Sequence, residues 1–312
     1  MQNVFDAFKE IVGKTFNWGF ALRFIAIYLL ELIVALAVGG LMAYGAFMYA
    51  LGSGFAVESL IVAGILLLAA LIVVVAISSA ISGIGLALGR DYLEGRQFTL
   101  SSVYEKAKPG ILPLIKIQLT ITILFLALFL AIASPGIAKV VSAFENYGIA
   151  GMASGVQSAM VSLIAAIGAV VLVYLVLLPF LLILSQSAFF GRLGVKKAMK
   201  RAWRLGKANF GRNWGLFILL IIVLFVVSFI FNLIQEGIIA AGGSSLAAMA
   251  IAAIINIVVQ FWIGILATLF SVKVYLLCIP AGAGRVTASK AFKAARTRAG
   301  AKARAKRAKK KK

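Results

Sequence analysis

The chain has 312 residues, 63% of them hydrophobic and only 13% charged, which excludes an ordinary soluble domain, where about 25% of residues are charged. The 31 Lys and Arg residues against 9 Asp and Glu give a net charge of +22, which predicts attraction to anionic lipid or nucleic acid. Histidine is absent and Cys278 is the single cysteine, so the sequence offers no internal disulfide and lacks the commonest general base and metal ligand.

Six apolar stretches predict an all-α integral membrane protein with six transmembrane helices. Each stretch reaches the ~20 mostly apolar residues that a spanning helix needs. They are Phe24–Ala50, Val57–Leu88, Ile111–Ser134, Met160–Phe190, Trp214–Ile234 and Leu246–Ile279. Residues 1–23 are predicted to form a cytoplasmic amphipathic lead, residues 24–280 a six-helix membrane domain, and residues 281–312 a basic cytoplasmic tail that is largely disordered. The lead is expected to be retained, because the apolar run after it is far longer than the ~7–15 residues of a signal-peptide core.

The charges of the connecting segments predict the orientation of the helices. The lead, the second and fourth connections and the tail carry most of the Lys and Arg, whereas the opposite side is predicted to hold only Lys139. Cytoplasmic loops carry the excess of Lys and Arg in membrane proteins. Both termini are therefore expected in the cytoplasm, and the protein in the plasma membrane.

Similar segments at nearly equal intervals predict an internal repeat. Gly-Arg opens a basic segment at residues 95, 191 and 284, and the apolar position of the pattern falls at Phe8, Val103, Met199 and Phe292. Each of the first three segments precedes two predicted spans. The membrane domain is therefore expected to consist of three tandem two-helix repeats, about 1–94, 95–190 and 191–283, each led by a cytoplasmic amphipathic helix and related by an axis along the membrane normal. A chance match between Ala- and Lys-rich segments is the alternative.

The stretch Pro179–Phe217 supports a family resemblance. It combines a proline near the end of a span, the segment Val195-Lys196-Lys197-Ala198-Met199-Lys200-Arg201-Ala202-Trp203-Arg204-Leu205, and a basic-aromatic start of the next helix. In this pattern the chain resembles the membrane domain attached to some glycerophosphoryl diester phosphodiesterases, and related stand-alone prokaryotic multi-pass membrane proteins. The resemblance implies a shared membrane fold without the family's reaction, because the catalytic domain of the phosphodiesterases is absent from this sequence.

Polar residues inside the predicted spans are candidates for function, because ionisable side chains in a membrane are costly. Glu31 lies about two turns into the first span and Lys273 about two turns before the end of the last, so an ion pair between them is predicted. This pair would either gate a transport path or be structural, or both side chains would extend to the headgroups. Asn256 and Gln260 share a helix face, and they either line a solute path or hydrogen-bond across helices.

A second group of candidates consists of cations expected to bind anionic lipid or a polyanion. They lie in the fourth connection and in the tail: Arg192, Lys196, Lys197, Lys200, Arg201, Arg204, Lys207, Arg285, Lys290, Lys293, Arg296, Arg298, Lys302, Arg304, Lys306, Arg307, Lys309, Lys310, Lys311 and Lys312. Each Lys or Arg near an anionic leaflet contributes about 1 kcal/mol of attraction. Clustered cations would also bind a ribosome or nucleic acid, because phosphate binding depends mainly on clustered Lys and Arg.

The sequence thus predicts a non-enzymatic membrane protein, a scaffold or tether whose basic cytoplasmic face and tail bind anionic lipid or a polyanionic partner. The alternative is a small-solute or lipid transporter with Glu31 and Lys273 near its inner mouth. No paired carboxylates, Ser/His pair or metal-ligand cluster is evident, so no catalytic site, metal or other cofactor is expected.

Overall fold

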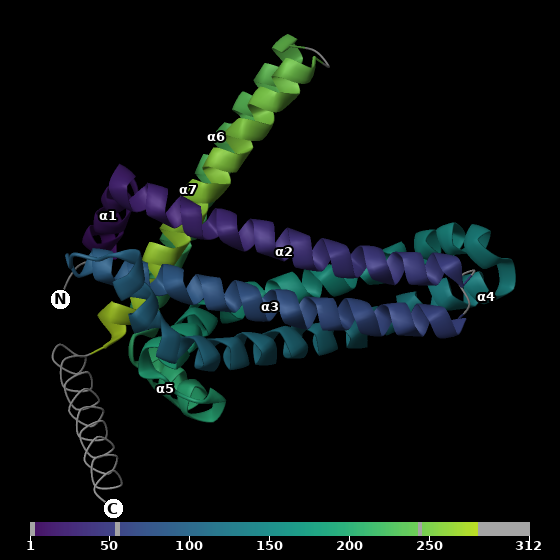
Figure 1. Ribbon diagram of the computed structural model, residues 1–312, viewed down its shortest axis with the longest axis horizontal. Coiled ribbons are helices and arrows are strands. Elements are labelled where there is room, and N and C mark those ends of the chain that lie inside the picture. The colour runs from purple at the N-terminus through teal and green to yellow at the C-terminus, as the bar shows by residue number, and fades with distance from the viewer. Residues whose placement is uncertain (1–3, 54–56, 243–244, 280–312) are drawn as a thin grey trace, which may run out of the picture.

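The computed structural model describes residues 4–53, 57–242 and 245–279, and every regular element in these ranges is an α-helix (Figure 1). The helices are α1 (Val4–Thr15), α2 (Trp18–Gly52), α3 (Val57–Leu93), α4 (Leu100–Gly191), α5 (Val195–Ala208), α6 (Phe210–Gly242) and α7 (Leu246–Cys278). α4 is interrupted at Gly148, whose φ of 61° and ψ of −147° are not helical. The two halves of α4 fold back on one another, because Gly136 packs against Ser162 and Gly155 against Val140.

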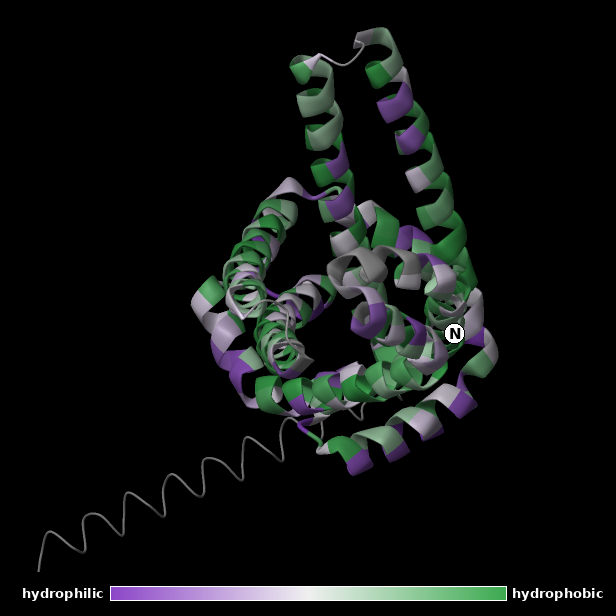
Figure 2. Cartoon of the chain, turned by 90° about the vertical axis from the view of Figure 1, so that its right-hand side faces the viewer, coloured by the Kyte–Doolittle hydropathy of each residue, from purple (hydrophilic) through white to green (hydrophobic). Residues whose placement is uncertain are grey.

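Within the described ranges, six helical segments are long and apolar enough to cross a membrane. They are Trp18–Gly52, Ile61–Leu93, Leu100–Gly148, Gly155–Gly191, Phe210–Gly242 and Leu246–Cys278. The shortest has 33 residues, well above the ~20 that span a bilayer. Hydrophobic residues, drawn in green, make up most of these helices (Figure 2). The predicted six-helix membrane class is confirmed, and the chain has the make-up of a multi-pass membrane protein.

The second predicted lead is not a separate helix. At Thr99 the side chain accepts a hydrogen bond from the Ser102 amide (3.3 Å), and the Ser102 hydroxyl accepts one from the Thr99 amide (3.1 Å). This capping box starts a helix at Leu100. The helix then continues through Pro109 and Pro113 into the third span. The first and third leads, by contrast, are the separate helices α1 and α5.

The long helices form two arms that meet at one end. α2, α3 and the two halves of α4 make the first arm, and the α6–α7 hairpin diverges from it (Figures 1 and 2). The arms meet where α1 and α5 lie. We call this the basic end; it comprises α1, α5, residues 91–106 and the parts of α2, α3, α4, α6 and α7 packed against them.

The hydrophobic core lies almost entirely at the basic end. Its largest fully buried side chains include Phe20, Phe24, Ile183, Leu216 and Tyr275. α7 is central to this core and contacts α1, α2, α3, α4 and α6. Towards the opposite end, the described helices expose many large apolar side chains, which in a bilayer contact lipid chains. The basic end is therefore the part of the protein whose side chains are held in a defined arrangement.

Candidate functional site

An ion pair joins α1 to α7, but with a different carboxylate from the predicted one. The Lys273 Nζ lies 2.6 Å from a carboxylate oxygen of Glu10, whose other oxygen lies 3.1 Å from the Lys14 Nζ. The Lys273 side chain is only 13% exposed. The predicted pairing of Lys273 with Glu31 is thus wrong, because α1 folds across the end of the bundle and brings Glu10 to Lys273.

Glu31 lies deeper along its helix than Lys273 does along its own. α2 begins at Trp18, so Glu31 is about 20 Å from the start of its helix, whereas Lys273 is about 8 Å from Cys278, the end of α7. Glu31 faces the hydroxyls of Ser78 and Ser82 on α3. The contact between α2 and α7 is made by other groups, the Tyr28 hydroxyl and the Thr268 hydroxyl, 3.0 Å apart.

We expect a Glu10→Gln change to destabilise the basic end by about 1.5 kcal/mol, the low end for a hydrogen bond to a charged group, because Glu10 is partly exposed. The measurement is the temperature at which the buried thiol of Cys278 becomes reactive towards a maleimide in detergent solution. Glu105→Gln is the control, because Glu105 is exposed and has no ion pair with a described residue. An unchanged transition in Glu10→Gln would contradict the α1–α7 pairing.

Asn256 and Gln260 do not line a path in the packed core. Both side chains are exposed on the surface of α7, and the Gln260 amide donates to the Asn256 side-chain oxygen at 3.5 Å. A buried polar contact of α7 is made instead by Ser271, whose hydroxyl accepts a hydrogen bond from the Gln186 side chain at 3.0 Å. This contact fastens α7 to the second half of α4.

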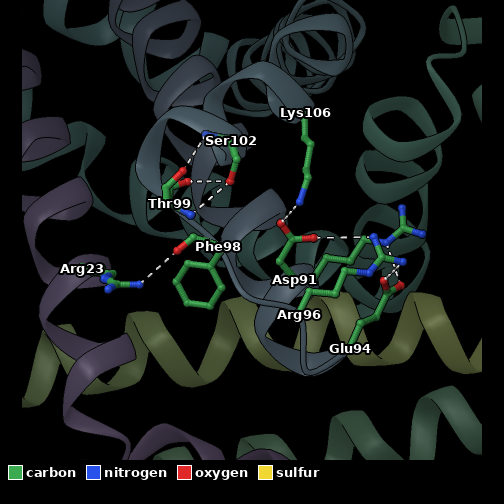
Figure 3. A network of polar contacts seen from close by, with 9 residues as sticks. Arg23, Asp91, Glu94, Arg96, Phe98, Thr99, Ser102 and Lys106 are labelled. Carbon is green, nitrogen blue, oxygen red and sulfur yellow. Dashed lines mark hydrogen bonds and ion pairs between the residues drawn. The ribbon is translucent and has the colours of Figure 1, made fainter. Parts of the chain in front are cut away.

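The turn between α3 and α4 carries a compact network of ion pairs (Figure 3). The Asp91 carboxylate, only 3% exposed, lies 2.5 Å from the Lys106 Nζ and 3.7 Å from the Arg96 guanidinium. Glu94 pairs with Arg96 at 2.5 Å and with Arg90 at 3.0 Å. The cations of this turn are thus neutralised within the protein.

The cations of α5 have no such partners. α5 contains Lys196, Lys197, Lys200, Arg201, Arg204 and Lys207 and no acidic residue. None of these six forms an ion pair with a carboxylate of the described residues. Five are exposed, and Arg201 lies over the ring of Tyr275 at 5.8 Å. The opposite side of the helix is buried through Ala198 and Ala202, so α5 presents a basic face away from the core.

The remaining predicted cations divide into two groups. Arg192 lies in the turn between α4 and α5, where its φ of 51° ends α4. The predicted tail cations, from Arg285 to Lys312, lie outside the described residues, as does the predicted disorder of the tail.

Sequence reasoning missed Glu10, Asp91, Lys106 and the separation of paired from unpaired cations. A local signal exists for parts of the two networks, because Glu10 and Lys14, like Arg90 and Glu94, are four residues apart on a helix. No local signal links Glu10 to Lys273, since 263 residues separate them.

No protein-family model, curated protein or solved structure matches the chain. The resemblance to the membrane domain of glycerophosphoryl diester phosphodiesterases stays a prediction. In residues 4–53, 57–242 and 245–279, no group of three or more potential metal ligands comes together. The function is therefore argued from the geometry of the basic end.

Proposed function

We propose that this chain is a non-enzymatic multi-pass protein of the plasma membrane that binds anionic phospholipid through its basic cytoplasmic face. The observation that carries the proposal is the basic face of α5, whose cations have no carboxylate partners among the described residues. Unpaired cations at the end of a membrane helix bundle face the headgroup region. At about 1 kcal/mol for each cation near an anionic leaflet, the five exposed cations of α5 supply up to about 5 kcal/mol of attraction.

The proposed orientation places the basic end in the cytoplasm. The cations Arg23, Arg90, Arg96 and Lys106 gather at this end together with α5. Lys139 lies in the hairpin of α4 near Gly148, at the opposite end. This asymmetry supports a cytoplasmic basic end under the rule that Lys and Arg accumulate on that side.

A repeated burial pattern supports the proposal of three tandem two-helix units. Each lead contains a pair of buried apolar residues one helical turn apart, namely Ala7 and Ile11, Val103 and Ala107, and Ala198 and Ala202; the first lead also buries Phe8. Successive first members are 96 and 95 residues apart. In the third unit the buried position is Ala198, one residue before Met199, which is 42% exposed. The three units therefore align best by the residues of each lead that pack on the core.

The residues on which the transporter alternative depended do not lie together. Glu31 and Lys273 belong to separate contacts, and Asn256 and Gln260 lie on the outer surface of α7. These four residues therefore do not come together as the transport alternative required.

Phosphatidylglycerol is expected to raise the temperature at which Cys278 of the full-length protein reacts with a maleimide, whereas phosphatidylcholine is not. The reason is that a ligand of the folded state stabilises it in proportion to its occupancy. The phosphatidylglycerol effect should shrink in salt, because the screening length falls from ~10 Å at 0.1 M to ~3 Å at 1 M ionic strength. Equal shifts with both lipids would refute the proposal.

A variant ending at Gly282 separates the tail from α5. We expect this variant to keep most of the phosphatidylglycerol effect, because α5 remains. Loss of the whole effect on truncation would assign lipid binding to the tail and contradict the role of α5. Ribosome or RNA binding that depends on residues 283–312, measured by co-sedimentation across a salt series, would instead support a tether to a polyanionic partner.

A further inference from the structure

A groove of about 800 Å³ runs beside α5, between the second half of α4 and the start of α6. Its walls are mostly apolar and come from three helices: Pro179, Phe180 and Ile183 of α4, Met199 and Trp203 of α5, and Phe210 and Trp214 of α6. The volume lies within the ~300–1,000 Å³ typical of small-molecule sites. The Trp203 ring is 68% exposed and packs edge-on against Phe180 at a centroid distance of 6.1 Å.

The rim of the groove is basic on the side of α5. Lys196, Lys200 and Lys207 line it together with Trp203. Offsets of 4, 7 and 11 residues from Lys196 place these four side chains on one face of the helix. They mark the border at which the apolar side of α5 meets its basic side. Lys197 and Arg204 do not line the groove, although they are exposed on the same helix.

A buried polar group also lines the groove. Asn213 of α6 is only 3% exposed, and its side-chain oxygen accepts a hydrogen bond from the Cys278 thiol at 3.3 Å. Its amide nitrogen has no hydrogen-bond partner among the residues that the structure describes. A buried donor left without an acceptor costs free energy, so a ligand that brings an oxygen to this wall gains a contact.

We propose that this groove binds a single anionic phospholipid, with an acyl chain along the apolar wall and the phosphate among Lys196, Lys200 and Lys207. The inference deepens the proposed function and rests on it. A soluble anion would leave the apolar wall without a contact, and a neutral lipid would leave the unpaired lysines without a counter-charge. Trp203 and Trp214 border the groove as aromatic side chains do at the headgroup level of a bilayer. Asn213, whose amide nitrogen is buried without a partner among the described residues, lines the same groove.

The test uses full-length protein in phosphatidylcholine vesicles that contain a trace of phosphatidylglycerol with a diazirine in its acyl chain. After illumination, the labelled peptides are mapped. Labelling is expected on residues 176–183 and 199–203, about tenfold above that from phosphatidylcholine with the same diazirine chain. Equal labelling by the two lipids would overturn the proposal, because the groove would then hold any neighbouring lipid.

Two matched double variants separate the groove from the charge of α5. Lys200→Gln/Lys207→Gln removes two rim cations, and Lys197→Gln/Arg204→Gln removes two cations of the same helix that lie off the rim. The first is expected to lower phosphatidylglycerol labelling about tenfold, and the second to lower it much less, because Lys197 and Arg204 contribute surface charge but do not line the groove. Equal losses would mean that only the surface charge attracts the lipid, and the groove proposal would fail while the proposed function stood.

Filling the groove provides a test that leaves every charge in place. A Cβ added at Gly206 meets only the tip of Ile183, at 3.9 Å, and Gly206 lines the groove, so we expect Gly206→Leu to occupy part of the groove. We expect labelling of the groove by both lipids to fall. The thermal stabilisation by phosphatidylglycerol should persist in part, through the remaining cations of α5. Unchanged labelling in Gly206→Leu would overturn the groove, whereas absence of any phosphatidylglycerol effect on the unaltered protein would defeat the proposed function itself.

Discussion

An Asp91→Asn variant is expected to lower the temperature of Cys278 exposure more than any other single charge change at the basic end. Asp91 is the least exposed carboxylate of the ion-pair networks and is shared by Lys106 and Arg96 (Figure 3). The amide keeps the shape but loses the charge that holds both cations. Lys106 and Arg96 are about half exposed and become hydrated, so the loss is set at about 2 kcal/mol, typical of hydrogen bonds to charged groups.

Glu94→Gln is the control that tests whether the burial of Asp91 matters. Glu94 also serves two cations, but its side chain is 23% exposed, and exposed pairs contribute only about 0–1 kcal/mol. A Lys106→Met variant and the Asp91→Asn/Lys106→Met double variant complete a cycle that isolates the coupling between the two residues. An Asp91→Asn transition no lower than that of Glu94→Gln would show that burial adds nothing to this network.

The number and place of the spanning helices could be predicted because the signal is local. A chain in lipid must satisfy its backbone within each segment, so length and hydropathy suffice to locate a span. The start of α4 shows the limit of this reasoning. The Thr99–Ser102 capping box favours a helix from Leu100. The two following prolines suggest a break there, and only the structure shows that the helix passes through them.

The side-chain pairing at the basic end could not be predicted, because it depends on how separate helices cross. Measuring depth from Arg23 placed Glu31 level with Lys273, but α2 starts at Trp18 and α1 folds across the end of the bundle. A count of charges likewise cannot distinguish Arg96, which is paired with carboxylates, from Lys200, which is paired with none in the described ranges. Arg96 is neutralised by Asp91 and Glu94, whereas α5 has no acid of its own and forms no ion pair with the part of the chain that the structure describes.

This difference between cations has a consequence for how the basic end works. The paired cations Lys106 of α4 and Lys273 of α7 join their helices to α3 and α1, whereas α5 packs on α4 and α6. The unpaired cations of α5 stay available to an external anion. Stability and lipid binding should therefore respond to different substitutions, with Asp91 and Glu10 acting on the first and Lys200 and Lys207 on the second.

Gly110→Ala is expected to destabilise the protein through a contact that carries no charge. A Cβ at Gly110 would lie 2.6 Å from the carbonyl oxygen and 2.7 Å from a ring carbon of Phe189. Phe189 cannot easily give way, because it is buried and its carbonyl accepts a hydrogen bond from the Arg192 amide in the turn before α5. Overpacking costs about 1–3 kcal/mol, and the ~1 kcal/mol that alanine gains in a helix offsets only part of it. A net loss of about 1 kcal/mol should appear as earlier Cys278 exposure.

Gly168→Ala is the control, since Gly168 lies in the same helix and a Cβ there has no neighbour within 4 Å. Only the helix preference acts at that position, so its transition should be equal to or higher than that of the unaltered protein. Because moving Phe189 also moves the turn that begins α5, Gly110→Ala should in addition reduce lipid labelling of residues 199–203. If Gly110→Ala and Gly168→Ala behaved alike, the two halves of α4 would not approach one another as closely as Gly110 and Phe189 indicate.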